Sequence, residues 1–329
     1  MTNIACGAWH SIALFNDNTV MCWGNDFYGQ CDPSQFALTD VIQVVCGCSH
    51  SVALFSNGTI QCLGNHNKNQ GDPVHFRFTN VIQVACGKYH SVALASNGTV
   101  QCWGNNKHNQ CDPVHLTFTD IIQVVCGEYH SVVLLSNRTV RCWGNNTWNQ
   151  CDPLHGTFTD VIQVVCGHSH SVALFSNGTI RCWGDNHKNQ CDPLYNTFTD
   201  VVQVACGKYH SVALLTNGTV QCWGNNYENQ CDPVHHTFTD VIQVACGRHH
   251  SVALLSNGTI RCWGNNECNQ CDPVHLKFKN VIQVICGYYH SVALLSNSTI
   301  RCWGDNTRDQ FNHVYCHITN VMMPCALLW

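Results

Sequence analysis

The stretch VIQVACGKYHSVALASNGTVQCWGNNKHNQ, residues 81–110, decides the fold, because the chain repeats its pattern eight times. The copies share one length of forty residues and begin at Met1, Val41, Val81, Ile121, Val161, Val201, Val241 and Val281. A strict period of this length indicates a solenoid or a propeller. We therefore expect residues 1–320 to form one domain of eight repeats, followed by a C-terminal tail, 321–329, that begins a ninth copy.

Each copy contains short apolar runs of strand length. In the second copy these are Val41–Cys46 and Ser51–Phe55, rich in β-branched residues and bounded by glycine. The pair Asn57-Gly58 between the second and third runs predicts a type I′ hairpin turn. An Asp-Pro loop and a final HLTFTD-like stretch leave room for a fourth strand, so four short strands fit each repeat.

A four-stranded antiparallel unit repeated radially predicts an all-β protein, a β-propeller with eight blades. The segments ACG-x-x-HSVAL, SNGTV, CWGNN and NQ resemble the repeat of the regulator of chromosome condensation family. The seven-bladed members of that family imply an alternative, seven blades with one displaced repeat. The chain departs from the family at a Gly-Gln step, where Gly29 has asparagine counterparts such as Asn69 and Asn109. Asparagine tolerates a left-handed backbone, so we expect an unchanged turn.

The two ends of the chain compete for one place in the ring. Met1–Gly7 and Val321–Trp329 could both complete a blade, but Pro324 lacks an amide donor. We expect Met1–Gly7 to close the ring and the C-terminal segment to pack outside it.

The bulk composition excludes several classes of protein. Hydrophobic residues make up 45% of the chain and charged residues 11%, which indicates a folded domain with a large core. The net charge is −5 without a basic run, so direct DNA binding is not expected. No apolar stretch is long enough to span a membrane, and the N-terminus does not read as an export signal. We expect a monomer in the cytoplasm or nucleus, not a secreted protein.

The 26 cysteines fall mainly into three columns. The columns of Cys86 and Cys102 are complete in all eight copies, whereas the column of Cys111 is replaced at Gly71 and Phe311. Obligatory pairing with the third column would leave partners unpaired, so we interpret the cysteines as reduced core thiols. Pairing between the first two columns stays open.

Cysteine and histidine recur four residues apart, as in Cys86 and His90, and could suggest zinc or a nucleophile with its base. Two ligands per repeat are too few for a structural zinc, and eight equivalent copies favour architecture over one catalytic centre. Adjacent His90 and Ser91 should point to opposite faces of a strand. The family resemblance implies a buried histidine bonded to backbone, so we expect no metal, no cofactor and no catalytic residues.

Differences between copies concentrate in two loops, after ACG and after W-G-N. Loops on a rigid scaffold commonly carry binding residues, and aromatic and arginine side chains are enriched in interfaces, although the same positions could simply be unconstrained. The candidate partner-binding residues are Trp9, Phe27, Tyr28, Lys88, Tyr89, Lys107, His108, Glu128, Tyr129, Trp148, Lys188, Lys208, Tyr209, Tyr227, Glu228, Arg248, His249, Tyr288 and Tyr289.

These patterns favour a non-catalytic scaffold that binds a protein partner through one face of the propeller. The resemblance also implies an alternative, guanine-nucleotide exchange on a Ran-like small GTPase, with chromatin attachment. Exchange in that family depends on an inserted β-wedge and chromatin binding on a basic N-terminal tail. We expect neither here, because no copy carries an insertion and the sequence starts within its first repeat. A structural or packaging role is the third candidate.

Overall fold

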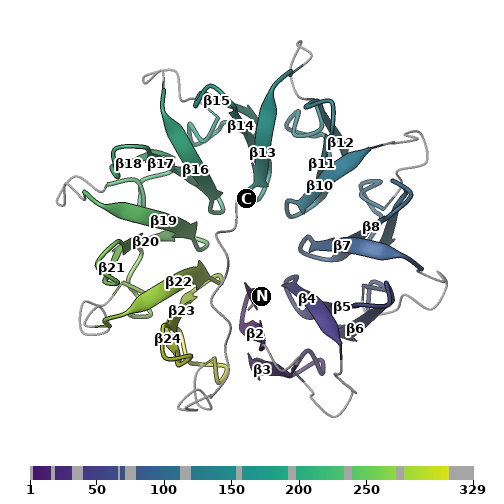
Figure 1. Cartoon of the computed structure of the whole chain (residues 1–329), viewed down its shortest axis with the longest axis horizontal. Coiled ribbons are helices and arrows are strands. Elements are labelled where there is room, and N and C mark those ends of the chain that lie inside the picture. Colours follow the sequence, from purple (N-terminus) through teal and green to yellow (C-terminus); the bar gives the residue numbers. More distant parts are fainter. Residues whose placement is uncertain are drawn as a thin grey trace.

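The computed structural model describes residues 3–15, 19–31, 40–65, 67–70, 79–111, 120–152, 158–191, 198–232, 239–271 and 278–310. In these ranges the chain forms eight three-stranded antiparallel sheets, one per repeat, arranged as blades in a ring (Figure 1). The predicted all-β propeller is confirmed, and eight blades exclude the seven-bladed alternative. None of the described segments is a helix that could cross a membrane. The stretches expected to form fourth strands fall largely outside the described residues.

The three strands of each blade follow one another in sequence and in space. The first strands, which lie nearest the centre, are β1 (Asn3–Cys6), β4 (Val41–Cys46), β7 (Val81–Cys86), β10 (Ile121–Cys126), β13 (Val161–Cys166), β16 (Val201–Cys206), β19 (Val241–Cys246) and β22 (Val281–Cys286). The second strands are β2 (His10–Leu14), β5 (His50–Phe55), β8 (His90–Ala95), β11 (His130–Leu135), β14 (His170–Phe175), β17 (His210–Leu215), β20 (His250–Leu255) and β23 (His290–Leu295). The third strands are β3 (Val20–Gly24), β6 (Ile60–Gly64), β9 (Val100–Gly104), β12 (Val140–Gly144), β15 (Ile180–Gly184), β18 (Val220–Gly224), β21 (Ile260–Gly264) and β24 (Ile300–Gly304).

The hydrophobic core lies between blades. Val52 and Leu54 of one blade pack with Val84 and Trp103 of the next, and similar clusters fill the other junctions. Trp103 also donates its indole N–H to the carbonyl of Gln70 in the preceding blade, 3.1 Å away. The repeated tryptophan therefore fills the space between blades, as expected from its period, and its polar edge is satisfied there.

The glutamine of the VIQV strand joins the innermost strands of adjacent blades. Gln243 donates from Nε2 to the carbonyl of Val284 at 3.1 Å and accepts from the Val284 amide at 2.9 Å. Gln43 and Gln123 bind Val84 and Val164 with both groups in the same way. The sheets of adjacent blades share no backbone ladder, so the glutamine side chain supplies hydrogen bonds between their innermost strands.

A closed circle of histidine–serine hydrogen bonds runs through all eight blades. His90 Nε2 lies 2.9 Å from Ser131 Oγ of the next blade, and the last histidine, His290, lies 2.8 Å from Ser11 of the first. Every one of these histidines and serines is fully buried. The prediction that the histidine bonds to backbone is therefore wrong, because its Nε2 bonds to a serine hydroxyl. His90 and Ser91 do point to opposite faces of their strand, as expected, and each bonds to a residue of a neighbouring blade.

The glycine of ACG makes room for this histidine. A Cβ built at Gly87 would overlap the His90 ring, and the Gly87 amide donates to the His90 carbonyl at 2.9 Å. The C-G-x-x-H spacing is thus a packing requirement of the turn, consistent with an architectural role.

The Asn-Gly hairpin differs from the type I′ prediction. Only Gly58 has a positive φ, 77°, and its amide donates to the Phe55 carbonyl at 2.9 Å, while the Phe55 amide donates to Thr59. This pattern is a three-residue loop with glycine in the left-handed position. Asn57 stays out of that region because its Oδ1 accepts from both the amide and the hydroxyl of Thr59. The recurring Asn-x-Thr triplet is therefore turn chemistry.

The substitution at the Gly-Gln step leaves the turn unchanged, as expected. Gly29 has φ of 73°, and its counterparts Asn69 and Asn109 have φ of 60° and 58°. Asp309 occupies the same position in the last repeat with φ of 59°. Short side chains that can bond locally adopt this conformation.

The ring closes by packing between the first and last blades. Strand β1 pairs with β2 of its own repeat, so it does not complete the sheet of the last repeat. Instead, Ile4 and Trp23 pack against Val292 and Ile300 in a core cluster like those of the other junctions. The C-terminal tail, 321–329, lies outside the described residues.

No disulfide joins the cysteines of the described segments. Burial raises the pKa of Cys86 to about 12, which keeps this thiol protonated at neutral pH. The sequence argued against disulfides between the second cysteine column, that of Cys102, and the third, that of Cys111. The two columns nevertheless lie side by side, since in the first repeat the sulfur atoms of Cys22 and Cys31 are 2.8 Å apart.

Candidate functional site

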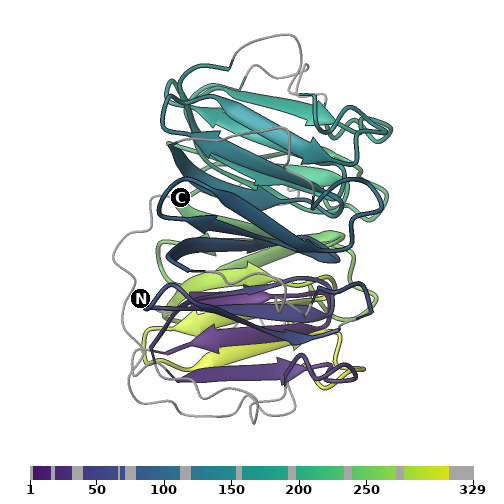
Figure 2. The same ribbon diagram turned by 90° about the vertical axis from the view of Figure 1, so that its right-hand side faces the viewer.

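Both variable loops of every repeat lie on one face of the propeller. The inner loops, such as 87–89, join the first and second strands, and the outer loops, such as 105–111, follow the third. In an antiparallel blade these two points are at the same end. The Asn105 amide accordingly donates to the Tyr89 carbonyl at 2.7 Å. We call this end the loop face and the opposite end, which carries the Asn-Gly turns, the turn face; Figure 2 shows the strands running between the two faces.

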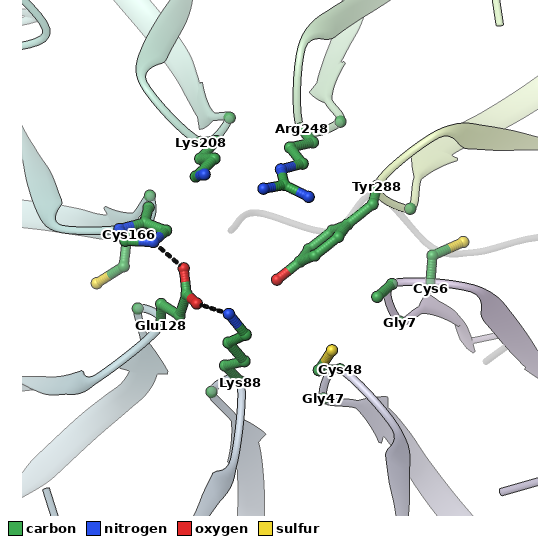
Figure 3. A pocket seen from close by; sticks show the side chains of 18 of the residues that line it. Cys6, Gly7, Gly47, Cys48, Lys88, Glu128, Cys166, Lys208, Arg248 and Tyr288 are labelled. Carbon is green, nitrogen blue, oxygen red and sulfur yellow. Dashed lines mark ion pairs between the residues drawn. The ribbon is translucent and has the colours of Figure 1, made fainter. Parts of the chain in front are cut away.

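The first variable residue of each inner loop lines the centre of the ring, and Figure 3 shows the side chains of Lys88, Glu128 and Tyr288 pointing into it. These eight residues, the central ring, are Ala8, Cys48, Lys88, Glu128, His168, Lys208, Arg248 and Tyr288. With the preceding cysteines and glycines they line a cavity of about 270 Å³. Their backbones also connect, since the Lys88 amide donates to the Glu128 carbonyl at 3.2 Å and most neighbours do the same.

One side of the central ring is neutralised by ion pairing. The Glu128 carboxylate is 7% exposed and contacts Lys88 Nζ through Oε1 and His168 Nε2 through Oε2. Burial, followed by the nearby cations Lys208, Lys88 and Arg248, lowers the pKa of His168 to about 4. His168 is therefore neutral at pH 7, with Nε2–H donating to Glu128 and Nδ1 accepting from the Ser169 hydroxyl at 2.7 Å.

The other side carries cations without a carboxylate. Within the described segments neither Lys208 nor Arg248 has an acidic partner. The Lys208 ammonium lies 4.6 Å from the centre of the Tyr209 ring, and Arg248 donates to the Tyr289 hydroxyl at 2.9 Å. The guanidinium carbon also lies 5.3 Å from the Tyr288 ring. Aromatic faces and hydroxyls therefore hold these two cations in place.

The second variable residue is aromatic in six of the eight inner loops, the exceptions being Ser49 and Ser169, and these side chains form an aromatic rim around the cavity. Tyr89 and Tyr129 have ring centres 6.3 Å apart, and His168 bridges Tyr129 to Tyr209. Trp9 packs edge-on against Tyr288 of the central ring at 5.9 Å, so the first and last blades are in contact here as well. These contacts fix the rim side chains to one another.

The outer loops project aromatic and charged side chains into solvent. Phe27 and Tyr227 are each 79% exposed, Trp148 44% and Tyr28 42%. Lys188 stacks over the Tyr227 ring of the next blade at 4.7 Å. Lys107, His108 and Glu228 are exposed as well.

Hydrogen bonds hold the backbone of each outer loop. Asn105 Oδ1 accepts from the Lys107 amide at 2.9 Å, and Gln110 Oε1 accepts from the His108 amide at 2.8 Å. Asn106 Oδ1 accepts from the Cys111 amide at 2.8 Å. The exposed side chains are therefore presented by ordered loops, and the repeated asparagines are the residues that order them.

The structure divides the candidate residues into two groups that the sequence did not separate. Lys88, Glu128, Lys208, Arg248 and Tyr288 face the cavity, whereas the remaining candidates lie on the rim or the outer loops. Sequence reasoning left out three cavity residues, Ala8, Cys48 and His168, although their position in the repeat was the available signal. The interpretation of the first cysteine column as core thiols is confirmed, since Cys46 and Cys86 pack against the clusters between blades and their sulfur atoms lie near the hydroxyls of Ser51 and Ser91.

Exposed aliphatic side chains on the turn face were also missed. Ile82 and Ile242 are 55% and 56% exposed, and equivalent residues in four other repeats are similar. Each sits at a register shift between the first and second strands, where a bulge residue has no ladder partner. The sequence signal was an apolar residue next to the strand start in every copy except the first, which has Thr2 there.

The residues described by the structure contain no group of three or more His, Cys, Asp and Glu side chains placed to hold a metal ion. The repeated histidines are committed to serine hydroxyls instead.

Comparison with known sequences identifies the repeat. The Regulator of chromosome condensation (RCC1) repeat profile matches seven of the eight copies, at residues 1–30, 81–110, 121–150, 161–190, 201–230, 241–270 and 281–310. A search of curated proteins gave no match.

Solved structures with the same fold come from different settings. Yeast RCC1 (Prp20), solved with bound Kap60, superposes with a TM-score of 0.57 at 21% identity, covering 88% of this chain and 79% of that one. The ectodomain of the Physcomitrella patens receptor kinase CR4 gives 0.58 at 20%, covering 80% and 73%. Human WBSCR16 gives 0.56 at 20%, covering 90% and 87%. These likenesses show the fold.

Proposed function

The chain belongs to the regulator of chromosome condensation (RCC1) repeat family, and from that premise we propose that it is a non-catalytic scaffold whose loop face binds a protein partner. The observation that carries the proposal is the set of solvent-exposed aromatic side chains on hydrogen-bonded loops, led by Phe27 and Tyr227 at 79% exposure. Large aromatic residues held in place bury much area on binding at a small entropic cost.

The named relatives support a protein partner as the ligand class. Yeast Prp20 was solved with Kap60, and a second structure of it is described with its binding properties to Gsp1p and histones. Two other neighbours are receptor-kinase ectodomains. What these propellers share with this chain is a ring of loops on a rigid ring of blades.

The experiment compares the two faces of the propeller. The partner is captured from native extract, purified and titrated against wild type, a loop-face variant (Phe27→Ser with Tyr227→Ser) and a turn-face control (Ile82→Ser with Ile242→Ser). Both variants exchange two exposed apolar side chains for serine, so their stability should be similar. We expect the loop-face variant to weaken binding by about ten-fold or more and the control to bind like wild type. The reverse order would move the binding site to the turn face.

Guanine-nucleotide exchange is the second candidate, because Prp20 shares the fold. The assay follows release of labelled GDP from a Ran-type GTPase with and without the protein. Accelerated release would replace the scaffold proposal with exchange activity, whereas an unchanged rate favours the scaffold.

A further inference from the structure

The centre of the ring combines a cavity with positive charge that the protein's own carboxylates leave uncompensated. Three central ring side chains are cationic, Lys88, Lys208 and Arg248, and one, Glu128, is anionic. This excess stands out because the whole chain carries a net charge of −5. Walls of low dielectric strengthen such a field inside a concave site.

The unpaired cations lie together on one side. Lys88 and the neutral His168 already hold both oxygens of Glu128, so that carboxylate is occupied away from Lys208 and Arg248. Figure 3 shows the Lys208 and Arg248 side chains directed toward the open centre, with the Tyr288 hydroxyl entering it from the next blade. Arg248 Nε is buried and donates to no acceptor within the described part of the chain. A buried donor without a partner indicates a missing acceptor.

The rest of the lining favours an anion over a cation or an apolar ligand. The cysteines add no negative charge to the cavity: their side chains turn away into the core between blades, as Figure 3 shows for Cys6 and Cys166, and burial raises the pKa of Cys86 and Cys206 to about 12. The backbone amides of the central ring are largely used in bonds around the ring, so recognition falls to side chains. Arginine and lysine together with a hydroxyl donor match the oxygens of a phosphate group.

We propose that Lys208, Arg248 and Tyr288 form a binding site for a small doubly charged oxyanion, inorganic phosphate or a small phosphate monoester, in the central cavity. The volume of about 270 Å³ holds such a group below the aromatic rim. The site is separate from the proposed partner surface on the outer loops and does not depend on it.

The test is calorimetric titration of the full-length protein with inorganic phosphate, in chloride buffer of constant ionic strength at pH 7.5. Wild type should show one saturable site per chain. Arg248→Met and Lys208→Met should each weaken it by about ten-fold, the loss expected for one charged hydrogen bond. Lys107→Met, which removes the same charge from an exposed outer loop, should bind like wild type.

Two further variants make the result independent of folding defects. Glu128→Gln removes the only carboxylate of the central ring and should tighten binding, a gain that damage to the fold would not produce. Arg248→Lys keeps the charge but loses the planar fork and should fall between wild type and Arg248→Met. The titration is repeated with glycerol phosphate to distinguish the two candidate ligands. Tighter binding of inorganic phosphate identifies free phosphate as the ligand, and tighter binding of glycerol phosphate identifies a phosphate monoester. Absence of saturation with both, or equal weakening by Lys107→Met, would overturn the site.

Discussion

Each repeat has left-handed backbone positions at the same places, and at the one in the Asn-Gly turn the residue is not always glycine. A residue with a Cβ is less stable in this conformation than glycine. Gly58, Gly178, Gly218 and Gly258 occupy the turn-face position, whereas the fourth repeat has Arg138 there with φ of 65°. The carbonyl of each glycine accepts from the next blade at 2.9–3.1 Å, but the bond from Val161 to Arg138 is 3.4 Å. Gly98, also left-handed with φ of 81°, has no such bond from the Ile121 amide, so the length of this link does not depend on the side chain alone. The strain at Arg138 follows from its positive φ, which is unfavourable for a residue with a Cβ.

Replacing this arginine should stabilise the protein. We expect Arg138→Gly to raise the free energy of unfolding by about 1 kcal/mol, because a left-handed non-glycine residue costs 1–2 kcal/mol and glycine loses part of that gain in the unfolded chain. Urea denaturation with a circular dichroism readout measures the change. The matched control is Gly178→Ala, which should destabilise, since a Cβ there would lie 2.8 Å from the Asp200 amide nitrogen. A loss of stability in Arg138→Gly would contradict the strain argument.

At the scale of the element, the strands were predictable and their cross-links were not. Apolar periodicity and glycine positions located the strand of Val41–Cys46 because those signals act within one repeat. The bonds of Gln43 and His50 join residues 41 apart, so no local pattern shows them. The available sign was a polar residue repeated within a buried run. The Asn-Gly turn was mispredicted because side-chain capping by Asn57 competes with the type I′ conformation.

The glutamine cross-link can be measured by comparing two repeats. Gln243 makes both bonds to Val284, whereas Gln163 is 5% exposed and its Oε1 has no partner in the described segments. Gln243→Met should lower the free energy of unfolding by about 1–2 kcal/mol, since it removes two hydrogen bonds and leaves buried backbone groups unpaired. Gln163→Met should be neutral or stabilising, because it removes an unsatisfied polar atom. Equal losses in chemical denaturation would show that the cross-link does not contribute.

At the scale of the whole molecule, the candidate site follows from closing the ring. The sequence placed variable residues in two loops, and antiparallel strands then put both loops on one face. It could not show that Lys88 and Lys208, 120 positions apart in sequence, share a cavity, since that requires the number of blades and the direction of each side chain. The same closure collects eight histidines into one buried circle, which makes the response to acid a property of the entire ring.

This circle predicts a sharp acid unfolding. Burial lowers the pKa of the eight histidines to about 3 for His10 and about 4 for His50, with the others alike. Because each pKa is lower in the folded state than in the unfolded chain, the unfolded chain binds more protons as the pH falls. The free energy of unfolding is therefore unaffected by these histidines above the unfolded pKa of about 6.5 and decreases below it.

At pH 5.5 each histidine has lost about 1.4 kcal/mol, so eight remove about 11 kcal/mol, comparable with the 5–15 kcal/mol that holds a typical domain folded. We therefore expect unfolding near pH 5.5, with uptake of about seven protons by these eight side chains. Far-ultraviolet circular dichroism from pH 7.5 to 4.5 follows the transition, and calorimetry in buffers of different ionisation enthalpy counts the protons. As a control, His130→Gln should reduce the number of protons taken up on unfolding by one and leave the uptake by the other seven histidines unchanged. Stability that stays constant between pH 7 and 5.5 would mean that these histidines take up protons within the folded ring, and the closed circle of neutral His–Ser bonds would be wrong.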